Sequence, residues 1–279
     1  MPQHPFLQVN VFSTDPLLGN PLAVVLGAEG LSEDRMAAFA RWTNLSETTF
    51  VSAPRDPAAD YRVRIFTTLG ELPFAGHPTL GSCHAWLAQG GVPRSEEIVQ
   101  ECGIGLVRVR RDPSGLAFEA PPLLRDAPLE PALRERVRAG LGVAADDLLD
   151  ARWVDNGPPW IAMRLRSRSA VLPLRPDYAA LEGLMLGVFA ACDESDDVDA
   201  QFETRAFIAG EAAPEDPVTG SLNAGIARWL LREAETPDRY VISQGTVLGR
   251  AGRVQVQREG GALWVGGACV TCIEGTVAL

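Results

Sequence analysis

The chain has 279 residues, of which 46% are hydrophobic and 22% are charged, a composition typical of a folded globular protein rather than a disordered one. Its net charge of -11 argues against a nucleic-acid-binding surface, which requires a basic patch. All 25 basic residues are Arg, and the absence of Lys excludes pyridoxal-phosphate enzymes and P-loop proteins, whose sites require one.

The first part of the chain alternates strand and helix signals. Apolar and polar residues alternate over 7–12 and over 61–67, which predicts two strands, and the apolar run 22–26 predicts a third. Ser32 precedes two acids and is a good N-cap for a helix with a buried apolar face. Residues 44–51 predict the strand that follows this helix.

Two similar turns occur at a constant offset of 139 residues (216 minus 77). Residues 77–82 read HPTLGS and residues 216–221 read DPVTGS, and each turn precedes an Ala-rich segment that predicts a helix, 83–89 and 222–231. Pro fits near a helix start because its missing N–H has no intrahelical partner there. Two such helix N-termini are expected to clamp a small anion between them.

The similarity extends beyond the turns and predicts an internal duplication. Residues 105–119 and 252–265 each predict a β-hairpin, at an offset of 147 residues (252 minus 105). A weaker similarity relates residues 19–24 to residues 157–162. Chance similarity among common residues would seldom produce three such pairs in the same order along the chain.

Pro residues between 121 and 131 predict a linker between two lobes. We therefore expect an N-terminal lobe over 1–125 and a C-terminal lobe over 126–279, with the last strand able to return to the first lobe. Short strands around two apolar helices predict an α+β fold in which a curved sheet wraps each helix. The other expectations are helices over 131–139 and 178–186, strands within 153–165 and from 207, and an exposed acidic loop over 192–200.

Cysteine usage and the chain start indicate a reduced, cytoplasmic protein. Five cysteines leave one unpaired in any disulfide scheme, and neither a signal-peptide pattern nor a membrane-length apolar run is present. Cys269 and Cys272 have redox-motif spacing, but on a strand the two side chains would face opposite sides. We expect no metal site.

Glu47 is the first candidate for catalysis. It lies among Ser46, Thr48 and Thr49, whose hydroxyls can orient a carboxylate without neutralising it. Such a carboxylate can take and return a proton as a general acid/base. The alternative is a Glu on an edge strand that faces solvent.

His77 is the second candidate, because it lies between Gly76 and Pro78 at a predicted helix start. The positive end of the helix dipole disfavours an imidazolium and keeps a neutral group that can donate or accept a hydrogen bond. The alternative is a His that only packs over the turn. His84 lies seven positions further on, but two His at this spacing without a nearby carboxylate are weak evidence for metal.

Asp216 takes the corresponding place in the second turn, either as a functional acid or as an N-cap. Thr219, Gly220 and Ser221 offer backbone N–H groups and hydroxyls that suit a substrate carboxylate. A hydrolytic triad is disfavoured because no Gly-x-Ser-x-Gly surrounds Ser221, and no Gly-x-Gly-x-x-Gly indicates a dinucleotide site.

Together these motifs resemble the PhzF-like (phenazine biosynthesis) family from about residue 6 to the C-terminus. The segments that carry the resemblance are residues 19–24, 44–48, 64–67, 71–79, 215–221, 244–245 and 249–250. The resemblance implies the diaminopimelate-epimerase-like fold, with two pseudo-symmetric lobes and the site in the cleft. It also implies a homodimer that uses no cofactor.

The resemblance assigns roles to individual residues. The best understood family member isomerises a dihydro-hydroxyanthranilate, and Glu47 matches its proton-carrying acid/base, while His77, Asp216 and Ser221 match residues that position the substrate. Related racemases use a Cys in each turn, and neither turn contains one here. Leu222-Asn223 stands where the family commonly shows Ala-His, so substrate identity does not carry over.

We therefore expect a cofactor-independent isomerase that shifts a proton on a small carboxylate-bearing metabolite, with a possible role in secondary metabolism. The catalytic candidates are Glu47, His77 and Asp216, and the substrate-binding candidates are Gly76, Thr219, Gly220 and Ser221. The alternatives are a cofactor-independent amino-acid racemase or epimerase and a non-catalytic protein that binds small acids. We expect no nucleic-acid partner and no membrane partner.

Overall fold

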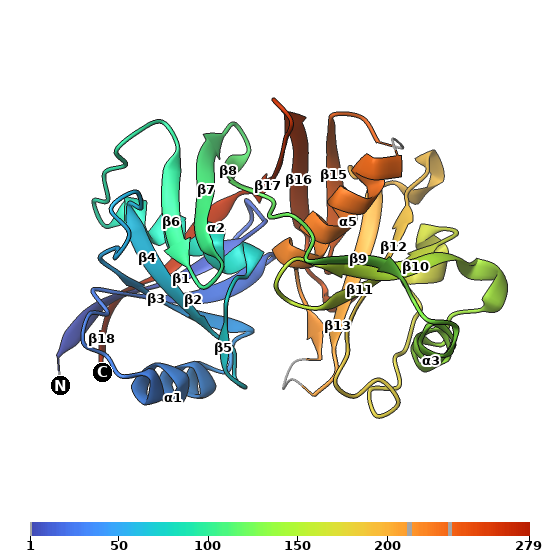
Figure 1. The fold of residues 1–279 in the computed structure, drawn as a ribbon, viewed down its shortest axis with the longest axis horizontal. Coiled ribbons are helices and arrows are strands. Elements are labelled where there is room, and N and C mark those ends of the chain that lie inside the picture. The colour runs from blue at the N-terminus through green and yellow to red at the C-terminus, as the bar shows by residue number, and fades with distance from the viewer. Residues whose placement is uncertain (1, 211–213, 234–235) are drawn as a thin grey trace.

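The protein folds into two α+β halves, each with one central helix surrounded by strands (Figure 1). The computed structural model describes residues 2–210, 214–233 and 236–279, and the strands of these residues belong to one connected hydrogen-bonded sheet. The enclosed helices are α2 (Gly76–Ala88) and α5 (Gly220–Glu233). The predicted fold class of two pseudo-symmetric lobes is confirmed.

The first half contains α2, one outer helix and its own strands, and the last strand of the chain is added to them. Its elements in chain order are β1 (Gln3–Val11), β2 (Asn20–Leu26), α1 (Glu33–Thr43), β3 (Glu47–Ser52), β4 (Tyr61–Phe66), β5 (Glu71–Leu72), β6 (Ile98–Cys102), β7 (Gly105–Asp112) and β8 (Gly115–Glu119).

Within the described residues, the second half contains α5, two further α-helices and the remaining strands. Its elements are β9 (Arg125–Pro128), α3 (Pro131–Leu141), β10 (Leu148–Asp155), β11 (Trp160–Leu165), α4 (Arg168–Val171), β12 (Met185–Ala191), β13 (Phe202–Ile208), β14 (Glu215–Asp216), β15 (Arg239–Gln244), β16 (Gly252–Glu259) and β17 (Ala262–Gly267). The final strand, β18 (Cys269–Ala278), follows β17 directly.

The strand pairing of the first half is repeated in the second. β2 and β3 run parallel with Leu22 opposite Glu47, and β11 and β12 run parallel with Trp160 opposite Met185. Both residues of the second pair lie 138 positions after those of the first (160 minus 22, 185 minus 47). Likewise, β4 pairs with β5 and β6 as β13 pairs with β14 and β15. The structure therefore supports the predicted duplication.

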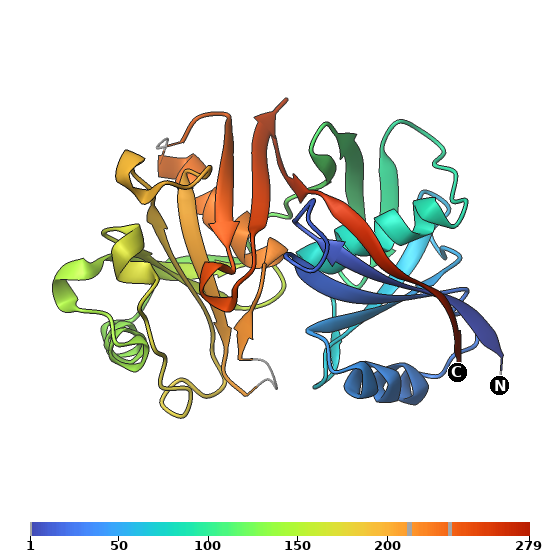
Figure 2. The same ribbon diagram turned by 180° about the vertical axis from the view of Figure 1, so that it is seen from behind.

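Each half also contains one strand that comes, in the chain, directly after a hairpin of the other half. After β8 the chain continues into β9, which pairs with β10, and after β17 it continues into β18, which pairs with β1. Figure 2 shows β18 running back across the first half toward the N-terminus. β8 and β17 pair with each other and join the halves, so the arrangement of the cleft walls is fixed by sheet hydrogen bonds. The lobe boundary at residue 125 stays a prediction.

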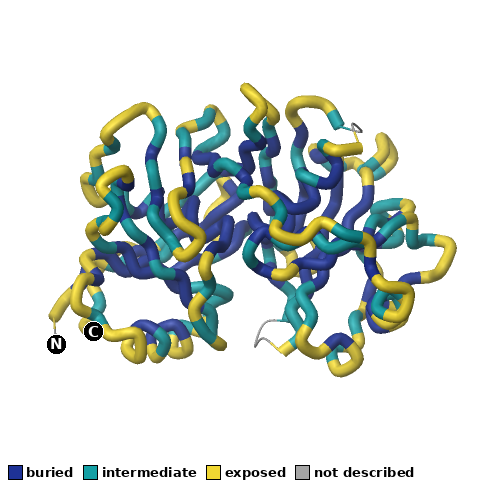
Figure 3. Tube along the Cα trace, in the orientation of Figure 1, coloured by how far each residue is buried: buried dark blue, intermediate teal, exposed yellow. Residues whose placement is uncertain are grey.

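Small side chains allow α2 to be enclosed by sheet. The helix has the sequence GHPTLGSCHAWLA, and its residues 76–83 are all buried against the surrounding strands. A helix that is buried on all faces needs side chains short enough for close packing. Figure 3 shows the same concentration of buried residues in the middle of both halves.

The two central helices meet at their N-termini, where each has a glycine. A Cβ placed on Gly76 would lie 2.7 Å from the Cα of Gly220, and a Cβ on Gly220 would lie 2.8 Å from the Cα of Gly76. Only glycine permits this backbone approach, because any larger residue would collide with the opposite helix. The contact brings the positive ends of both helices to one point.

Several local predictions hold, one predicted helix is wrong, and the strand predicted from 207 is β13, which begins earlier, at Phe202. Ser32 caps α1 by accepting a hydrogen bond from the Arg35 N–H, and both predicted hairpins are present. The helix predicted over 178–186 is instead a series of turns followed by β12. The Asp177 carboxylate accepts the N–H groups of Ala179 and Ala180, but Gly183 has φ +78°, which ends any helical turn before Met185. Helix α2 begins at Gly76, so the first predicted turn is itself helical.

No helix within the described ranges combines the length and the hydropathy needed to span a bilayer.

Replacing Gly76 with Ala tests the contact between the helices. We expect Gly76→Ala to lower the free energy of unfolding by about 1–3 kcal/mol, because the added methyl group overpacks the helix junction. Gly275→Ala is the matched control, since a Cβ there meets no atom within 4 Å, and its change should stay within about 0.5 kcal/mol. Equal stability of the two variants in urea titrations would contradict the account.

Candidate active site

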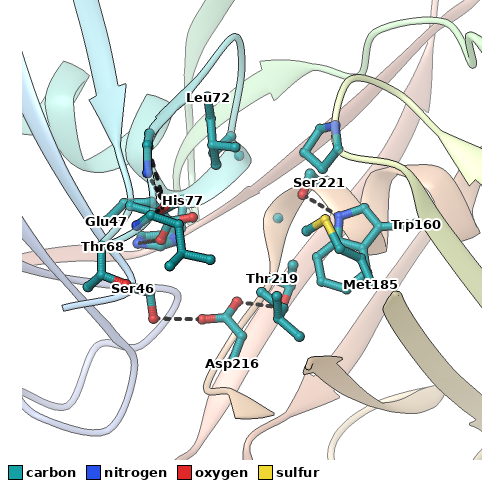
Figure 4. A pocket seen from close by; sticks show the side chains of 18 of the residues that line it. Ser46, Glu47, Thr68, Leu72, His77, Trp160, Met185, Asp216, Thr219 and Ser221 are labelled. Carbon is teal, nitrogen blue, oxygen red and sulfur yellow. Dashed lines mark hydrogen bonds and ion pairs between the residues drawn. The ribbon is translucent and has the colours of Figure 1, made fainter. Parts of the chain in front are cut away.

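A cavity of about 410 Å³ lies where the two halves meet, at the N-termini of α2 and α5. All seven residues that the sequence predicted for the site line it (Figure 4). The lining residues of the first half lie within segments 44–47 and 67–77, and those of the second within 158–160, 183–185, 208–209 and 216–221. The structure thus brings together residues that are up to 177 positions apart in the chain (221 minus 44).

Glu47 and His77 form a close pair within the first half. Glu47 begins β3, His77 is the second residue of α2, and the His77 Nε2 lies 3.5 Å from the Glu47 Oε2. The imidazole is only 2% exposed, and this burial lowers the pKa of His77 to about 3. The side chain is therefore neutral near pH 7, as the sequence indicated, but burial rather than the helix dipole is the main cause.

The contacts of His77 define where its single ring proton lies. The Asn20 Nδ2 lies 3.3 Å from the His77 Nδ1, but its two hydrogens are directed to closer acceptors, the Asp216 Oδ1 at 2.8 Å and the Val218 carbonyl at 2.9 Å. Because an amide nitrogen cannot accept, a proton on Nδ1 would have no acceptor at Asn20, which favours an unprotonated Nδ1. The neutral ring then carries its hydrogen on Nε2, which faces Glu47. His77 thus presents a hydrogen-bond donor to the carboxylate and to the cavity.

Asp216 belongs to the second half but is held largely by side chains of the first. The Asn20 Nδ2 donates to its Oδ1 at 2.8 Å, and the Ser46 hydroxyl donates to the same oxygen at 3.1 Å. The Thr219 hydroxyl donates to Oδ2. Asp216 lies on β14, and Thr219 rather than Asp216 is the residue directly before α5, so the N-cap alternative does not describe its position.

Gln244, at the end of β15, holds the turn between Asp216 and α5 through four hydrogen bonds. Its Oε1 accepts from the Thr219 N–H at 3.0 Å and from the Asn223 Nδ2 at 2.7 Å. Its Nε2 donates to the Asp216 carbonyl at 3.1 Å and to the Thr219 hydroxyl at 2.9 Å. All four polar valences of this buried amide are used, so the turn has one fixed conformation.

The two helix starts form the end of the cavity that suits an anion. Gly76, Gly220 and Ser221 border it, and the first N–H groups of a helix have no intrahelical acceptor. The Trp160 Nε1 donates to the Ser221 hydroxyl at 2.9 Å and orients it. A carboxylate placed here would accept backbone N–H groups from two helix dipoles.

Thiols do not contribute to the lining of this cavity. None of the five cysteines, all of which lie in described segments, lines it. Cys83 is buried inside α2, and burial raises the pKa of its thiol to about 12. Cys269 and Cys272 are free thiols on β18, and within the described residues no cluster of His, Cys, Asp and Glu has metal-site geometry.

The departure at Leu222-Asn223 lies behind the cavity wall. Both side chains are buried, and neither borders the cavity. Leu222 packs against Gly187 on β12, and Asn223 supports Gln244. The difference from the family at these two positions therefore changes the residues packed behind the second turn, not the residues that border the cavity.

Other residues of the site were not predicted as such. Asn20 and Gln244 lie in segments that carried the family resemblance, which was the available signal. Ser46 was expected to orient Glu47, and its hydroxyl donates to the Asp216 carboxylate. Trp160 lies in the weak repeat at residues 157–162. Met185 was missed because its segment was predicted to be helical.

Comparison with known proteins supports the family resemblance found in the sequence. A sequence model of the family described as Phenazine biosynthesis-like protein (PhzC-PhzF) matches residues 9–275. The chain is 36% identical to Antisense-enhancing sequence 1 of Schizosaccharomyces pombe, with 99% of each chain covered. It is 31% identical to a trans-2,3-dihydro-3-hydroxyanthranilate isomerase of Pseudomonas chlororaphis, with 99% of this chain and 100% of that protein covered.

Solved structures share the fold. A PhzF-family protein of Enterococcus faecalis matches with a TM-score of 0.79 at 24% identity, covering 100% of both chains. A hydroxyproline epimerase of Agrobacterium vitis matches with a TM-score of 0.62 at 13% identity, covering 99% of this chain and 93% of that one. The chain belongs to the PhzC/PhzF phenazine biosynthesis-like family. It is an isomerase.

The buried imidazole predicts a pH dependence of stability. The pKa of His77 is about 3 in the folded protein against about 6.5 when exposed, so between these values the unfolded chain binds a proton that the folded chain does not. This contribution is complete above pH 6.5, and stability should fall by about 1.4 kcal/mol per pH unit as the pH is lowered toward 3. Histidine NMR should show a neutral Nε2–H tautomer at pH 5, and a titration midpoint between pH 5 and 7 would contradict the account.

Gln244 provides a test of how the second turn is held. We expect Gln244→Leu to destabilise the protein by at least about 3 kcal/mol, because it leaves several buried polar groups without partners. Gln201→Leu is the matched control, since Gln201 is exposed and accepts one backbone hydrogen bond, and it should cost less than about 1 kcal/mol. Denaturant unfolding measures both variants, and similar losses would show that Gln244 has no special role.

Proposed function

We propose that the protein catalyses a cofactor-independent proton shift on a small carboxylic acid, with Glu47 as the general acid/base. The observation that carries the proposal is the position of Glu47 and its neutral partner His77 beside two converging helix N-termini in one cavity. This arrangement offers a proton carrier next to a site for an anion. A proton on carbon adjacent to, or conjugated with, a carboxylate becomes acidic when that carboxylate is stabilised.

The proposed reaction proceeds through one carboxylate. Glu47 removes a proton from a substrate carbon, and the electron pair of the broken C–H bond is delocalised toward the substrate carboxylate. The helix N-termini of α2 and α5 stabilise the negative charge that develops on the carboxylate oxygens. Glu47 then returns the proton to a different carbon, so the double bond moves and no oxidant or reductant is consumed.

His77 and Asp216 assist this transfer in different ways. Because burial keeps His77 neutral, its Nε2–H can donate a hydrogen bond to Glu47 or to the substrate without placing a positive charge beside them. Asp216 is fixed by Asn20, Ser46 and Thr219, which leaves its position independent of the substrate. We propose that it orients a polar substituent of the substrate near the reacting carbon.

The repeat relationship favours one base over two. The position in the second half that corresponds to Glu47 is Met185, which cannot carry a proton. A racemase or epimerase that uses two symmetric bases would need an ionisable group there. Of the other carboxylates at the cavity, Glu71 is bound by Arg64, so Asp216, from the second half, is the candidate for a second base. Inversion of an amino acid by Glu47 and Asp216 is the second candidate activity.

Substitution of Glu47 tests the proposal. We expect Glu47→Gln to reduce the isomerisation rate by about 10²- to 10⁴-fold, because it removes the proton carrier but keeps the shape of the side chain. The first compound to assay is trans-2,3-dihydro-3-hydroxyanthranilate, followed by other cyclic carboxylic acids. Glu135→Gln, on the exposed face of α3, is the matched control and should leave the rate unchanged.

The same assays separate the alternatives. Undiminished turnover by Glu47→Gln would contradict the role of Glu47, and loss of optical rotation with a chiral amino acid would support the epimerase. Ligand-induced stabilisation without turnover across the panel would support a non-catalytic binder. The homodimer and the cytoplasmic location expected from the sequence stay predictions.

A further inference from the structure

The internal repeat duplicates an ion pair as well as the strands that carry it. In the first half, the Arg64 Nε and Nη2 bind the two carboxylate oxygens of Glu71 at 2.7 and 2.5 Å. In the second half, the Arg205 Nε and Nη2 bind the two carboxylate oxygens of Glu215, both at 2.8 Å. Both are two-pronged contacts of a planar guanidinium with a carboxylate, a geometry that fixes orientation as well as distance.

The two ion pairs occupy equivalent positions in two equivalent hairpins. Phe66 on β4 pairs with Glu71 on β5. Phe207 on β13 pairs in the same way with Glu215 on β14. Each arginine precedes its phenylalanine by two positions, and its guanidinium lies over that ring, 5.1 Å from the centroid in the first half and 4.9 Å in the second. The ion pair is therefore part of the repeated framework.

The residue after each glutamate borders the cavity. In the first half this residue is Leu72, and in the second it is Asp216. The strand pairing continues in register, since Leu72 lies opposite Ile65 and Asp216 lies opposite Ala206. The equivalent position therefore carries an apolar side chain in one half and a carboxylate in the other.

Arg205 is more enclosed than its counterpart in the first half. Its side chain is 2% exposed, against 18% for Arg64. The Arg205 Nη1 is directed at three backbone carbonyl oxygens within residues 171–174, at distances of 3.0–3.2 Å. Every nitrogen of this guanidinium has an acceptor, so the side chain has one fixed position. Glu215 is thereby tied to β13 and to the segment that follows α4.

We propose that Arg205 is a positioning residue, which acts through Glu215 to hold Asp216 at the cavity. The inference rests on the proposed function, in which Asp216 orients the substrate. Asp216 follows Glu215 directly on β14, so a displaced Glu215 moves the backbone from which the Asp216 side chain projects. Asn20 and Ser46 hold the Asp216 Oδ1 from the first half, at 2.8 and 3.1 Å. The ion pair supplies the matching restraint from the second half.

Glu215→Gln tests the proposal in the intact protein. The amide keeps the size of the side chain but has one acceptor oxygen, so one of the two hydrogen bonds from Arg205 is lost. Because the Asn20 amide donates to Asp216, its side-chain NMR signals report where that carboxylate lies. We expect these signals to shift in Glu215→Gln. We expect kcat to fall about tenfold or more and KM to change less than about threefold, because the helix N-termini still hold the anion.

Glu101→Gln is the matched control. The Glu101 side chain is 15% exposed, against 12% for Glu215, and it binds the Arg62 guanidinium at 3.3 Å. Neither member of this ion pair borders the cavity, so the variant should leave the Asn20 signals and kcat unchanged. Arg205→Lys is the second test variant, because an ammonium keeps the charge but lacks the planar fork that spans both oxygens. It should reproduce the changes seen in Glu215→Gln.

The outcomes separate the positioning role from the proposed function, because the NMR measurement needs no substrate. Unshifted Asn20 signals in folded Glu215→Gln and Arg205→Lys variants would overturn the positioning role. Equal losses of kcat in Glu215→Gln and Glu101→Gln would also overturn it, since any weakened ion pair would then slow the reaction. Shifted signals with an undiminished kcat would support the positioning role and refute the use of Asp216 in the reaction.

Discussion

The close approach of two helix N-termini is the constraint on which the site depends. Gly76 and Gly220 let the backbones of α2 and α5 meet with no room for a Cβ on either side. Since each helix is enclosed by its own half, this contact also fixes how the two halves face each other. We propose that the backbone N–H groups at this junction form the anion site, in a chain that has no Lys and places no described Arg at the cavity.

The chemistry follows from differences imposed on a repeated framework. The repeat supplies two equivalent strand pairs and two equivalent helix starts, but it fills them unequally, with Glu47 against Met185 and His77 against Asp216. Asn20 connects the two halves, because its amide reaches both the His77 ring and the Asp216 carboxylate. A symmetric scaffold thereby places a carboxylate, Glu47, where the equivalent position of the other half holds a thioether, which suits a single proton carrier better than a symmetric pair.

The sequence revealed those parts of the site that are encoded locally. The two similar turns and the strand start at Glu47 are recognisable from neighbouring residues, and all seven predicted residues border one cavity. The roles of Asn20 and Gln244 depend on hydrogen bonds to residues 196 and 28 positions away, respectively, which no local pattern reports. Met185 was missed because the apolar run before it resembles a helix, whereas Gly183, at φ +78°, ends that possibility.

The central claim is that Glu47 carries one proton between two carbons of the bound acid. Its most direct test is single-turnover isomerisation of a substrate labelled with deuterium on the carbon that loses its proton, with the product analysed by NMR. The account predicts that part of the deuterium appears on the carbon that gains a proton, because a carboxylate holds only the proton that it removed, and that this transfer disappears in Glu47→Gln. Transfer that persists undiminished in Glu47→Gln, or a label that is always lost to solvent, would contradict it.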